Sequence, residues 1–118
     1  MKILRFTPEH ESPIEGRPYE TVGAFTTPLG HGQGDGRTYV VRFEPGGRIG
    51  SHLTGFGQLL IVVEGSGWVE QDGHRVSIER HEAAYFPRGV MHSKGSDAGM
   101  TAVMVQLLDL ETGPPDDD

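Results

Sequence analysis

Residues 58–78 read QLLIVVEGSGWVEQDGHRVSI, and this stretch decides the fold class of the chain. Its first six residues form the most apolar run of the sequence. That run is too short for most helices and is β-branched at its end, so it favours a buried strand. A glycine-rich turn follows at residues 64–67. Two further short segments flank Asp72-Gly73, a dipeptide typical of two-residue β-hairpin turns. The stretch therefore predicts consecutive antiparallel strands.

The same alternation of short apolar segments and turns continues on both sides of this stretch. The chain has 18 glycines and 8 prolines, and many of them lie between the apolar segments as turn residues. The only helical alternative is at residues 107–111, where the last apolar segment is poor in β-branched residues. Many short strands separated by turns are typical of a β-sandwich or β-barrel. We expect strands near residues 3–6, 21–27, 38–43, 58–63, 68–71, 74–78, 83–86, 91–94 and 100–110.

The regions outside these strands are expected to be arms or loops of one domain that spans residues 1–118. Residues 1–20 predict an N-terminal arm, which has too few apolar residues to fold by itself and should lie on another surface. Residues 29–37 carry four glycines and predict a flexible loop or lid. The last residues, from about 112–118, end in three aspartates and predict a disordered acidic tail. The barrel itself is expected at about residues 38–108.

The composition narrows the classes of function. Ten Lys and Arg face seventeen Asp and Glu, which gives a formal net charge of −7, so nucleic acid is not an expected partner. Cysteine is absent, which excludes disulfides and thiolate metal sites. No apolar run has the length of a membrane helix, and the N-terminus lacks the apolar core of a secretory signal. A soluble, cytoplasmic protein without a membrane partner is therefore expected.

Two segments resemble the two sequence motifs of the cupin superfamily. The first family motif contains His-x-His followed by a glutamate, and His52 occupies the position of its first histidine. The second motif has Pro-x-Gly, two residues and then a histidine, and Pro87, Gly89 and His92 match it. The resemblance covers the whole expected barrel region. It implies an all-β fold, the cupin-type double-stranded β-helix or jelly-roll barrel, for the single domain.

Four positions depart from the family pattern. Members of the family usually bind a divalent metal through two histidines and a glutamate of the first motif and one histidine of the second. Here Thr54 stands at the second histidine position and Gln58 at the glutamate position. His81 replaces the glycine that opens the second motif, and Ser96 replaces its final asparagine. Because that glycine often adopts a positive φ, His81 predicts an altered or strained turn.

The resemblance implies a weak metal site at His52, Gln58 and His92. Two imidazoles and one amide oxygen suit zinc, nickel, iron, copper or manganese, and they leave coordination positions open for water or a substrate. Gln58 contributes no negative charge, so the site should bind a metal less tightly than one with a carboxylate. His52 and Thr54 share a face of their strand, and Gln58 joins them unless the strand bulges. The alternative roles are hydrogen-bonded or exposed histidines and a glutamine that hydrogen-bonds inside the barrel.

Four further residues are candidates for binding a small molecule, since barrel mouths are common ligand sites. They are Thr54, Tyr39, Phe43 and Phe86. The alternative role of the three aromatic residues is core packing. His31, His74 and His81 are expected in solvated turns. The alternative role of His31 is that of a replacement ligand carried by the glycine-rich loop.

Three functions remain open, because a fold does not determine an activity. The first is a metal-dependent enzyme of the dioxygenase or isomerase type. The second is a metal-free module that binds or senses a small molecule. The third is a metal-free isomerase in which a histidine acts as the base and Tyr39 as its partner. No catalytic residue can be named from the sequence. The resemblance also implies a homodimer that pairs through edge strands and exchanged N-terminal arms.

Overall fold

The computed structural model describes residues 1–14 and 20–113, and most of these residues lie in β-strands. The elements follow the chain as β1 (Lys2–Arg5), η1 (Pro8–His10), β2 (Ser12–Pro13), β3 (Phe25–Thr26), β4 (Gly30–Phe43), β5 (Arg48–Leu53), β6 (Gly57–Gln71), β7 (His74–Glu79), β8 (Glu82–Phe86), β9 (Met91–Gly95) and β10 (Met100–Thr112). The all-β fold expected from the sequence is confirmed. Within the described part of the chain, no helix has the length and apolar character needed to cross a membrane.

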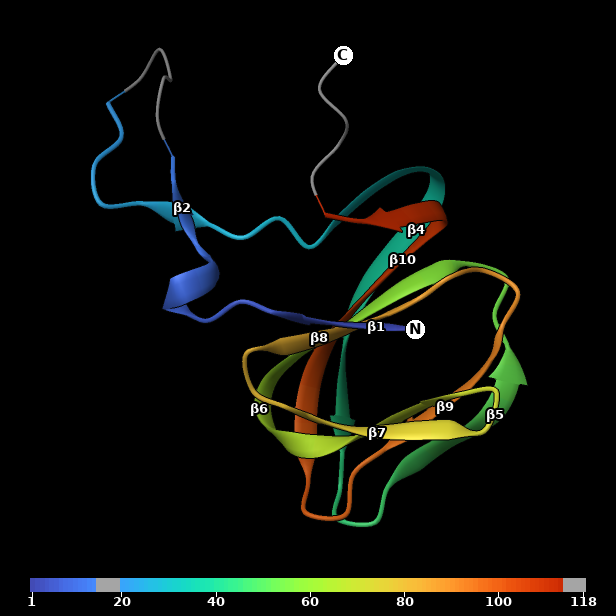
Figure 1. Ribbon diagram of the computed structural model, residues 1–118. Helices are drawn as coiled ribbons and strands as arrows, with labels where there is room; N and C mark the ends of the chain where they lie inside the picture. The colour runs from blue at the N-terminus through green and yellow to red at the C-terminus, as the bar shows by residue number, and fades with distance from the viewer. Residues whose placement is uncertain (15–19, 114–118) are drawn as a thin grey trace.

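Two layers of antiparallel strands form the barrel (Figure 1). One layer has the strand order β1-β8-β6-β10-β4. The other contains β5, β9 and β7 together with the second half of β6. Residues 57–65 of β6 pair with β10, whereas residues 66–71 pair with β7. The β6 strand therefore belongs to both layers and connects them, as in a jelly-roll barrel.

The corner of β6 lies at Gly65. Its backbone has a φ of 81°, a conformation that favours glycine. A Cβ atom at this position would also overlap the backbone oxygen of Gly99. Both constraints require glycine where the strand leaves one layer and enters the other. The hairpin that follows turns at Asp72-Gly73, where Gln71 pairs with His74, as the sequence predicted.

The apolar core fills the space between the two layers. Successive strand residues point to opposite faces, so every second residue of each strand faces inward. The buried core consists of Phe43, Leu60, Val62, Val69, Ile78, Ala84, Phe86, Met100, Ala102 and Met104. Phe43 and Phe86, two of the candidate ligand-binding residues, are thus members of this core.

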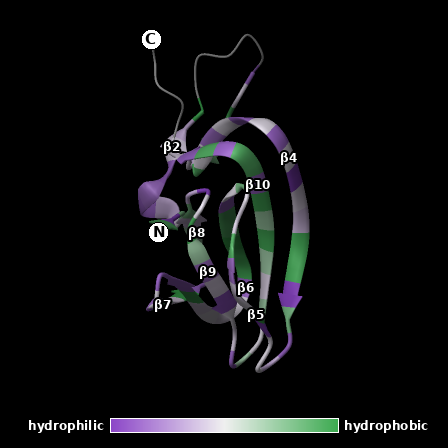
Figure 2. Cartoon of the chain, turned by 90° about the vertical axis from the view of Figure 1, so that its right-hand side faces the viewer, coloured by the Kyte–Doolittle hydropathy of each residue, from purple (hydrophilic) through white to green (hydrophobic). Residues whose placement is uncertain are grey.

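The expectation of a flexible loop at residues 29–37 is wrong. Residues 30–37 form the first half of β4, which pairs with β10 from Gly30 to Phe43. Figure 2 shows the two strands curving together, with the distal half of β4 hydrophilic and the half against the barrel hydrophobic. The glycines serve close packing here, because a Cβ on Gly32 would overlap the backbone oxygen of Asp109. Glycine in this segment permits two backbones to approach closely and does not indicate flexibility.

Two other local expectations need correction, and one is confirmed. The strand expected at residues 21–27 is limited to β3, which pairs with β2 in a separate two-stranded sheet. The helical alternative at residues 107–111 is wrong, since β10 continues as a strand to Thr112. His81 has a φ of 73°, so the strained turn expected from its replacement of a glycine is present.

The sequence predicts an arm at the N-terminus and an acidic tail at the C-terminus. β1 of the arm pairs with β8 at the edge of the larger sheet. The segment with η1 and β2 then leaves the barrel on one side (Figure 1). Residues 15–19 of the arm and residues 114–118 of the acidic tail lie outside the described residues.

Candidate functional site

His52 and His92 lie side by side at one end of the smaller layer. They are directly opposite each other in the ladder between β5 and β9. Their ring centroids are 4.7 Å apart. His52 is exposed, and its Nδ1 lies 2.7 Å from the backbone oxygen of Gly50. Because a carbonyl oxygen only accepts, Nδ1 carries the proton, and Nε2 of a neutral His52 is left as a lone-pair acceptor.

His92 is the buried member of this pair. Its residue is 1% exposed, and its ring also packs edge-on against Phe86, with centroids 4.6 Å apart. Neither Nδ1 nor Nε2 of His92 has a hydrogen-bond partner in the described structure. An unsatisfied buried polar group costs about 1–3 kcal/mol. The unpartnered His92 nitrogens therefore make this residue a candidate for contacting a ligand.

Gln58 reaches the barrel interior from the opposite layer. The strand that carries His52 ends at Leu53, and β6 begins only at Gly57, so His52 and Gln58 do not share one strand face. The chain turns at residues 54–56, and Thr54 holds this turn by donating a hydrogen bond to the Phe56 backbone oxygen at 2.7 Å. Gln58 Nε2 in turn donates to Thr54 Oγ1 at 3.2 Å. Thr54 thus fixes the orientation of the side-chain amide of Gln58.

Lys94 is the interior residue that the sequence interpretation missed. It follows His92 by two residues on β9 and so lies on the same face of that strand. The residue is 1% exposed, and Nζ donates a hydrogen bond of 2.9 Å to Gln58 Oε1. Nζ also lies 5.4 Å from the centroid of the Phe86 ring. The spacing His-x-Lys on an expected strand was the signal that could have revealed it.

These contacts gather the interior polar groups around one aromatic ring. Phe86 touches the His92 ring and lies opposite Gln58 in the ladder between β8 and β6. A hydrogen-bonded chain runs in one direction, from Lys94 through Gln58 and Thr54 to the Phe56 backbone oxygen. Because Lys94 donates to Gln58 Oε1 and Gln58 Nε2 donates to Thr54, the amide of Gln58 is fixed with its oxygen toward Lys94.

The electrostatics of the site follow from burial. Desolvation, together with the charges of Lys94 and His52, lowers the pKa of His92 to about 3. His92 is therefore a neutral imidazole at neutral pH, with one N–H donor and one acceptor. Desolvation also lowers the pKa of Lys94 to about 8. At neutral pH Lys94 is an ammonium, and it is the one charge of this interior cluster.

The donor set fits a divalent metal only in part. The unpartnered nitrogens of His92 and the free Nε2 of His52 suit a transition metal. The oxygen of Gln58 does not suit it, because a positive ammonium already lies 2.9 Å away and would repel a second cation. Among residues 1–14 and 20–113, no group of three or more His, Cys, Asp or Glu side chains is placed to hold a metal.

The other candidate residues lie in different surroundings. Tyr39 is on the edge strand β4, opposite Met104, and is 42% exposed. Phe43 is buried in the apolar core. His31 lies on β4, with Nδ1 3.1 Å from the Gly113 backbone oxygen and Nε2 3.5 Å from Glu111. The described contacts of His31 are thus with residues at the C-terminal end of β10 and not with His52 or His92.

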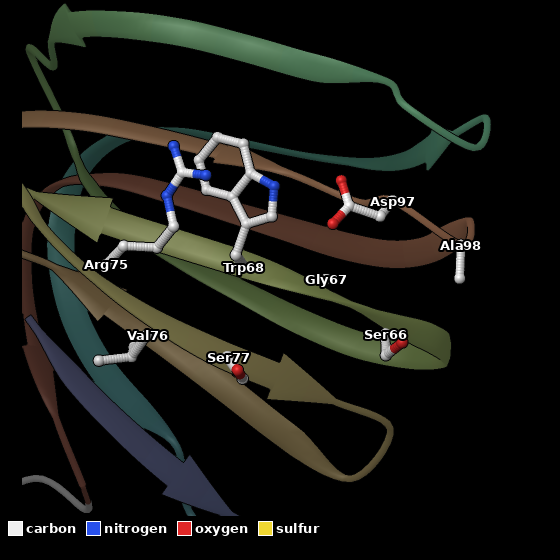
Figure 3. A pocket seen from close by; sticks show the side chains of 8 residues that line it. All are labelled: Ser66, Gly67, Trp68, Arg75, Val76, Ser77, Asp97 and Ala98. Carbon is white, nitrogen blue, oxygen red and sulfur yellow. The ribbon is translucent and has the colours of Figure 1, made fainter.

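A separate hollow of about 480 Å³ lies on the outer face of the smaller layer. Figure 3 shows Arg75 stacked over Trp68, with Asp97 beyond the indole ring. The Arg75 guanidinium carbon lies 3.6 Å from the Trp68 ring centroid, and its Nε donates to Glu70 at 3.0 Å. The Trp68 ring also covers Gly95 on the neighbouring strand. These side chains contact one another, and the lining of the hollow does not include His52, Gln58, His92 or Lys94.

Comparison with known proteins agrees with this geometry. Residues 39–106 match the sequence profile of the cupin domain. The chain belongs to the cupin family. His52 and His92 of this cupin both lie within the matched residues.

Relatives of known activity or structure support the same assignment. The chain is 38% identical over 68 residues to an (R)-mandelonitrile lyase of Granulicella tundricola. That match covers 57% of this chain and 50% of the lyase, so the cupin spans about half the length of this curated relative. A cupin-like protein of Thermotoga maritima superimposes with a TM-score of 0.60 at 25% identity, over 65% of this chain and 63% of that one. A salicylate 1,2-dioxygenase of Pseudoaminobacter salicylatoxidans has a TM-score of 0.59 at 15% identity, over 65% of this chain and 25% of that one, which shows the fold alone.

Proposed function

We propose that this cupin binds a small molecule in its barrel without a resident divalent metal, and that the Lys94 ammonium supplies the central positive charge. The observation that carries the proposal is the 2.9 Å hydrogen bond from Lys94 Nζ to Gln58 Oε1. Gln58 stands at the position where family members supply a glutamate ligand. Its oxygen here accepts from an internal cation that belongs to the protein.

The neutral character of Gln58 fits this arrangement. An ammonium hydrogen-bonded to an amide keeps its full charge available to a ligand, whereas a carboxylate at this position would neutralise it. The two imidazoles add donors and acceptors next to the charge. His52 is exposed and His92 buried, so a molecule that enters from solvent meets His52 first.

A second candidate function is weak binding of a divalent metal by His52 and His92. The observation that favours it is the 4.7 Å spacing of the two rings together with the unpartnered nitrogens of His92. The relative named as a lyase keeps an enzymatic activity among the candidates. In this case Gln58 would not serve as a ligand while Lys94 remains charged beside it.

Calorimetry with zinc, nickel and manganese separates the two candidates. The parent protein is expected to bind each metal no more tightly than the millimolar range. Gln58→Glu alone should gain little, because the new carboxylate forms an ion pair with Lys94. The double variant Gln58→Glu/Lys94→Met should bind at least tenfold more tightly, since the carboxylate is then free.

The matched control replaces the other lysine of the chain, the exposed Lys2. Gln58→Glu/Lys2→Met should behave as Gln58→Glu does. Micromolar zinc binding by the parent that is lost in His92→Gln would refute the metal-free proposal and support the second candidate.

A further inference from the structure

The interior of the barrel holds a positive charge that no carboxylate compensates. Lys94 is 1% exposed, and among residues 1–14 and 20–113 it forms no ion pair. Its only hydrogen bond in that part of the chain is to the neutral amide oxygen of Gln58. An ammonium carries three N–H donors, so two of them have no protein acceptor there. A buried charge without a counter-ion is costly unless a partner is supplied.

A second polar group beside this charge is also unpartnered. His92 is buried on the same face of β9 as Lys94, and neither of its ring nitrogens has a hydrogen-bond partner in the described structure. Phe86 connects the two groups, because its ring packs on the His92 ring and lies 5.4 Å from Lys94 Nζ. An ammonium and an imidazole with unpartnered N–H groups therefore both lie next to the Phe86 ring.

We propose that Lys94 and His92 form a binding site for a small monocarboxylate. This inference rests on the proposed function, because a metal on the two imidazoles would take the His92 nitrogen. One carboxylate oxygen accepts a hydrogen bond from the Lys94 ammonium, and the other accepts from a ring N–H of His92. A carboxylate thereby supplies the missing counter-ion and the missing hydrogen-bond acceptor together.

The charge of the site favours a monocarboxylate over a phosphate dianion or a neutral amide. The site contributes one positive charge through the Lys94 ammonium, and Gln58 beside it is a neutral amide. A monoanion makes the bound site neutral. A phosphate dianion would leave one negative charge uncompensated in the interior, and a neutral amide would leave the ammonium uncompensated. Acetate should therefore bind more tightly than either inorganic phosphate or acetamide.

The test is calorimetric titration of the full-length protein with acetate, acetamide and inorganic phosphate at constant ionic strength. Acetamide has nearly the shape of acetate and no charge, so this comparison needs no variant. Lys94→Met is expected to weaken acetate binding at least tenfold. Lys94→Gln serves as a second variant if Lys94→Met perturbs the near-ultraviolet circular dichroism. Lys2→Met removes the same charge from the surface and should leave the affinity unchanged.

The outcomes are distinct for the ligand class and for the metal-free site. Acetate binding that needs Lys94 and exceeds acetamide binding supports the inference. Equal acetate binding by the Lys94 and Lys2 variants, or tighter binding of phosphate, overturns it. Acetamide binding as tight as acetate, without metal binding, overturns the carboxylate assignment while the metal-free site stands. Acetate binding that appears only with added zinc overturns both.

Discussion

Replacing Lys94 with methionine should stabilise the protein at neutral pH. Burial lowers the pKa of Lys94 from 10.5 to about 8. Each tenfold change in proton affinity corresponds to about 1.4 kcal/mol, so burying the ammonium costs about 3 kcal/mol of folding free energy. Methionine has a similar length and no charge. It leaves Gln58 Oε1 without its donor, which costs about 1 kcal/mol. The expected net gain of Lys94→Met at pH 7 is therefore about 2 kcal/mol.

The pH dependence of the free energy of unfolding provides a second test of the cost of burying the Lys94 ammonium. The folded pKa of Lys94 is depressed, so between about pH 8 and pH 10.5 the unfolded chain binds more protons than the folded one. The stability contributed by this residue thus rises with pH across that window, and the full penalty applies below pH 8. From pH 7 to pH 10 the advantage of Lys94→Met should fall by about 2.5 kcal/mol and disappear.

Urea unfolding followed by the fluorescence of Trp68, the single tryptophan, measures both quantities. Lys2→Met is the control, and its stability should track the parent at every pH. A Lys94→Met protein that is less stable than the parent at pH 7 would refute the reasoning. So would a stability difference that stays constant from pH 7 to pH 10, because either result means that the ammonium is compensated in the folded state.

Three other predictions concern the fold and the assembly. Gly32→Ala should lose about 1–3 kcal/mol in urea unfolding, because its Cβ overlaps the Asp109 backbone, while Gly50→Ala, with open space around it, should stay within about 0.5 kcal/mol of the parent. His81→Gly should raise the unfolding free energy by about 1 kcal/mol, since it relieves a φ of 73°; an unchanged or lower value contradicts the strain. Light scattering at micromolar concentration should detect a homodimer, and a monomer unchanged by deletion of residues 1–20 would count against the role of the arm.

The sequence supports correct prediction of most elements of the barrel. Short β-branched runs, the Asp72-Gly73 hairpin and the glycine at position 65 are local signals, and each acts within a few residues of itself. The strained turn at His81 also follows from a local rule, the preference of positive φ for glycine. The loop predicted at the glycine-rich residues 29–37 is wrong because glycine is typical both of flexible loops and of strands whose backbones approach closely. Only the partner strand β10 decides between these two meanings.

The candidate site is less predictable because it depends on which strands face each other. The motif positions identified His52, Gln58 and His92, and local alternation places Lys94 on the same face as His92. The hydrogen bond from Lys94 to Gln58 joins residues 36 positions apart, on opposite layers of the barrel.

What the sequence by itself determined is the family, the all-β class and the residue types at the motif positions. These depend on short-range pattern and spacing, which are readable along one strand. What only the tertiary structure decided is that an ammonium occupies the neighbourhood of Gln58 and that both nitrogens of His92 lack a hydrogen-bond partner in the described structure. The physical reason is that burial and pairing across two layers are properties of the closed barrel, and desolvation acts on a side chain only when the facing layer excludes water from it.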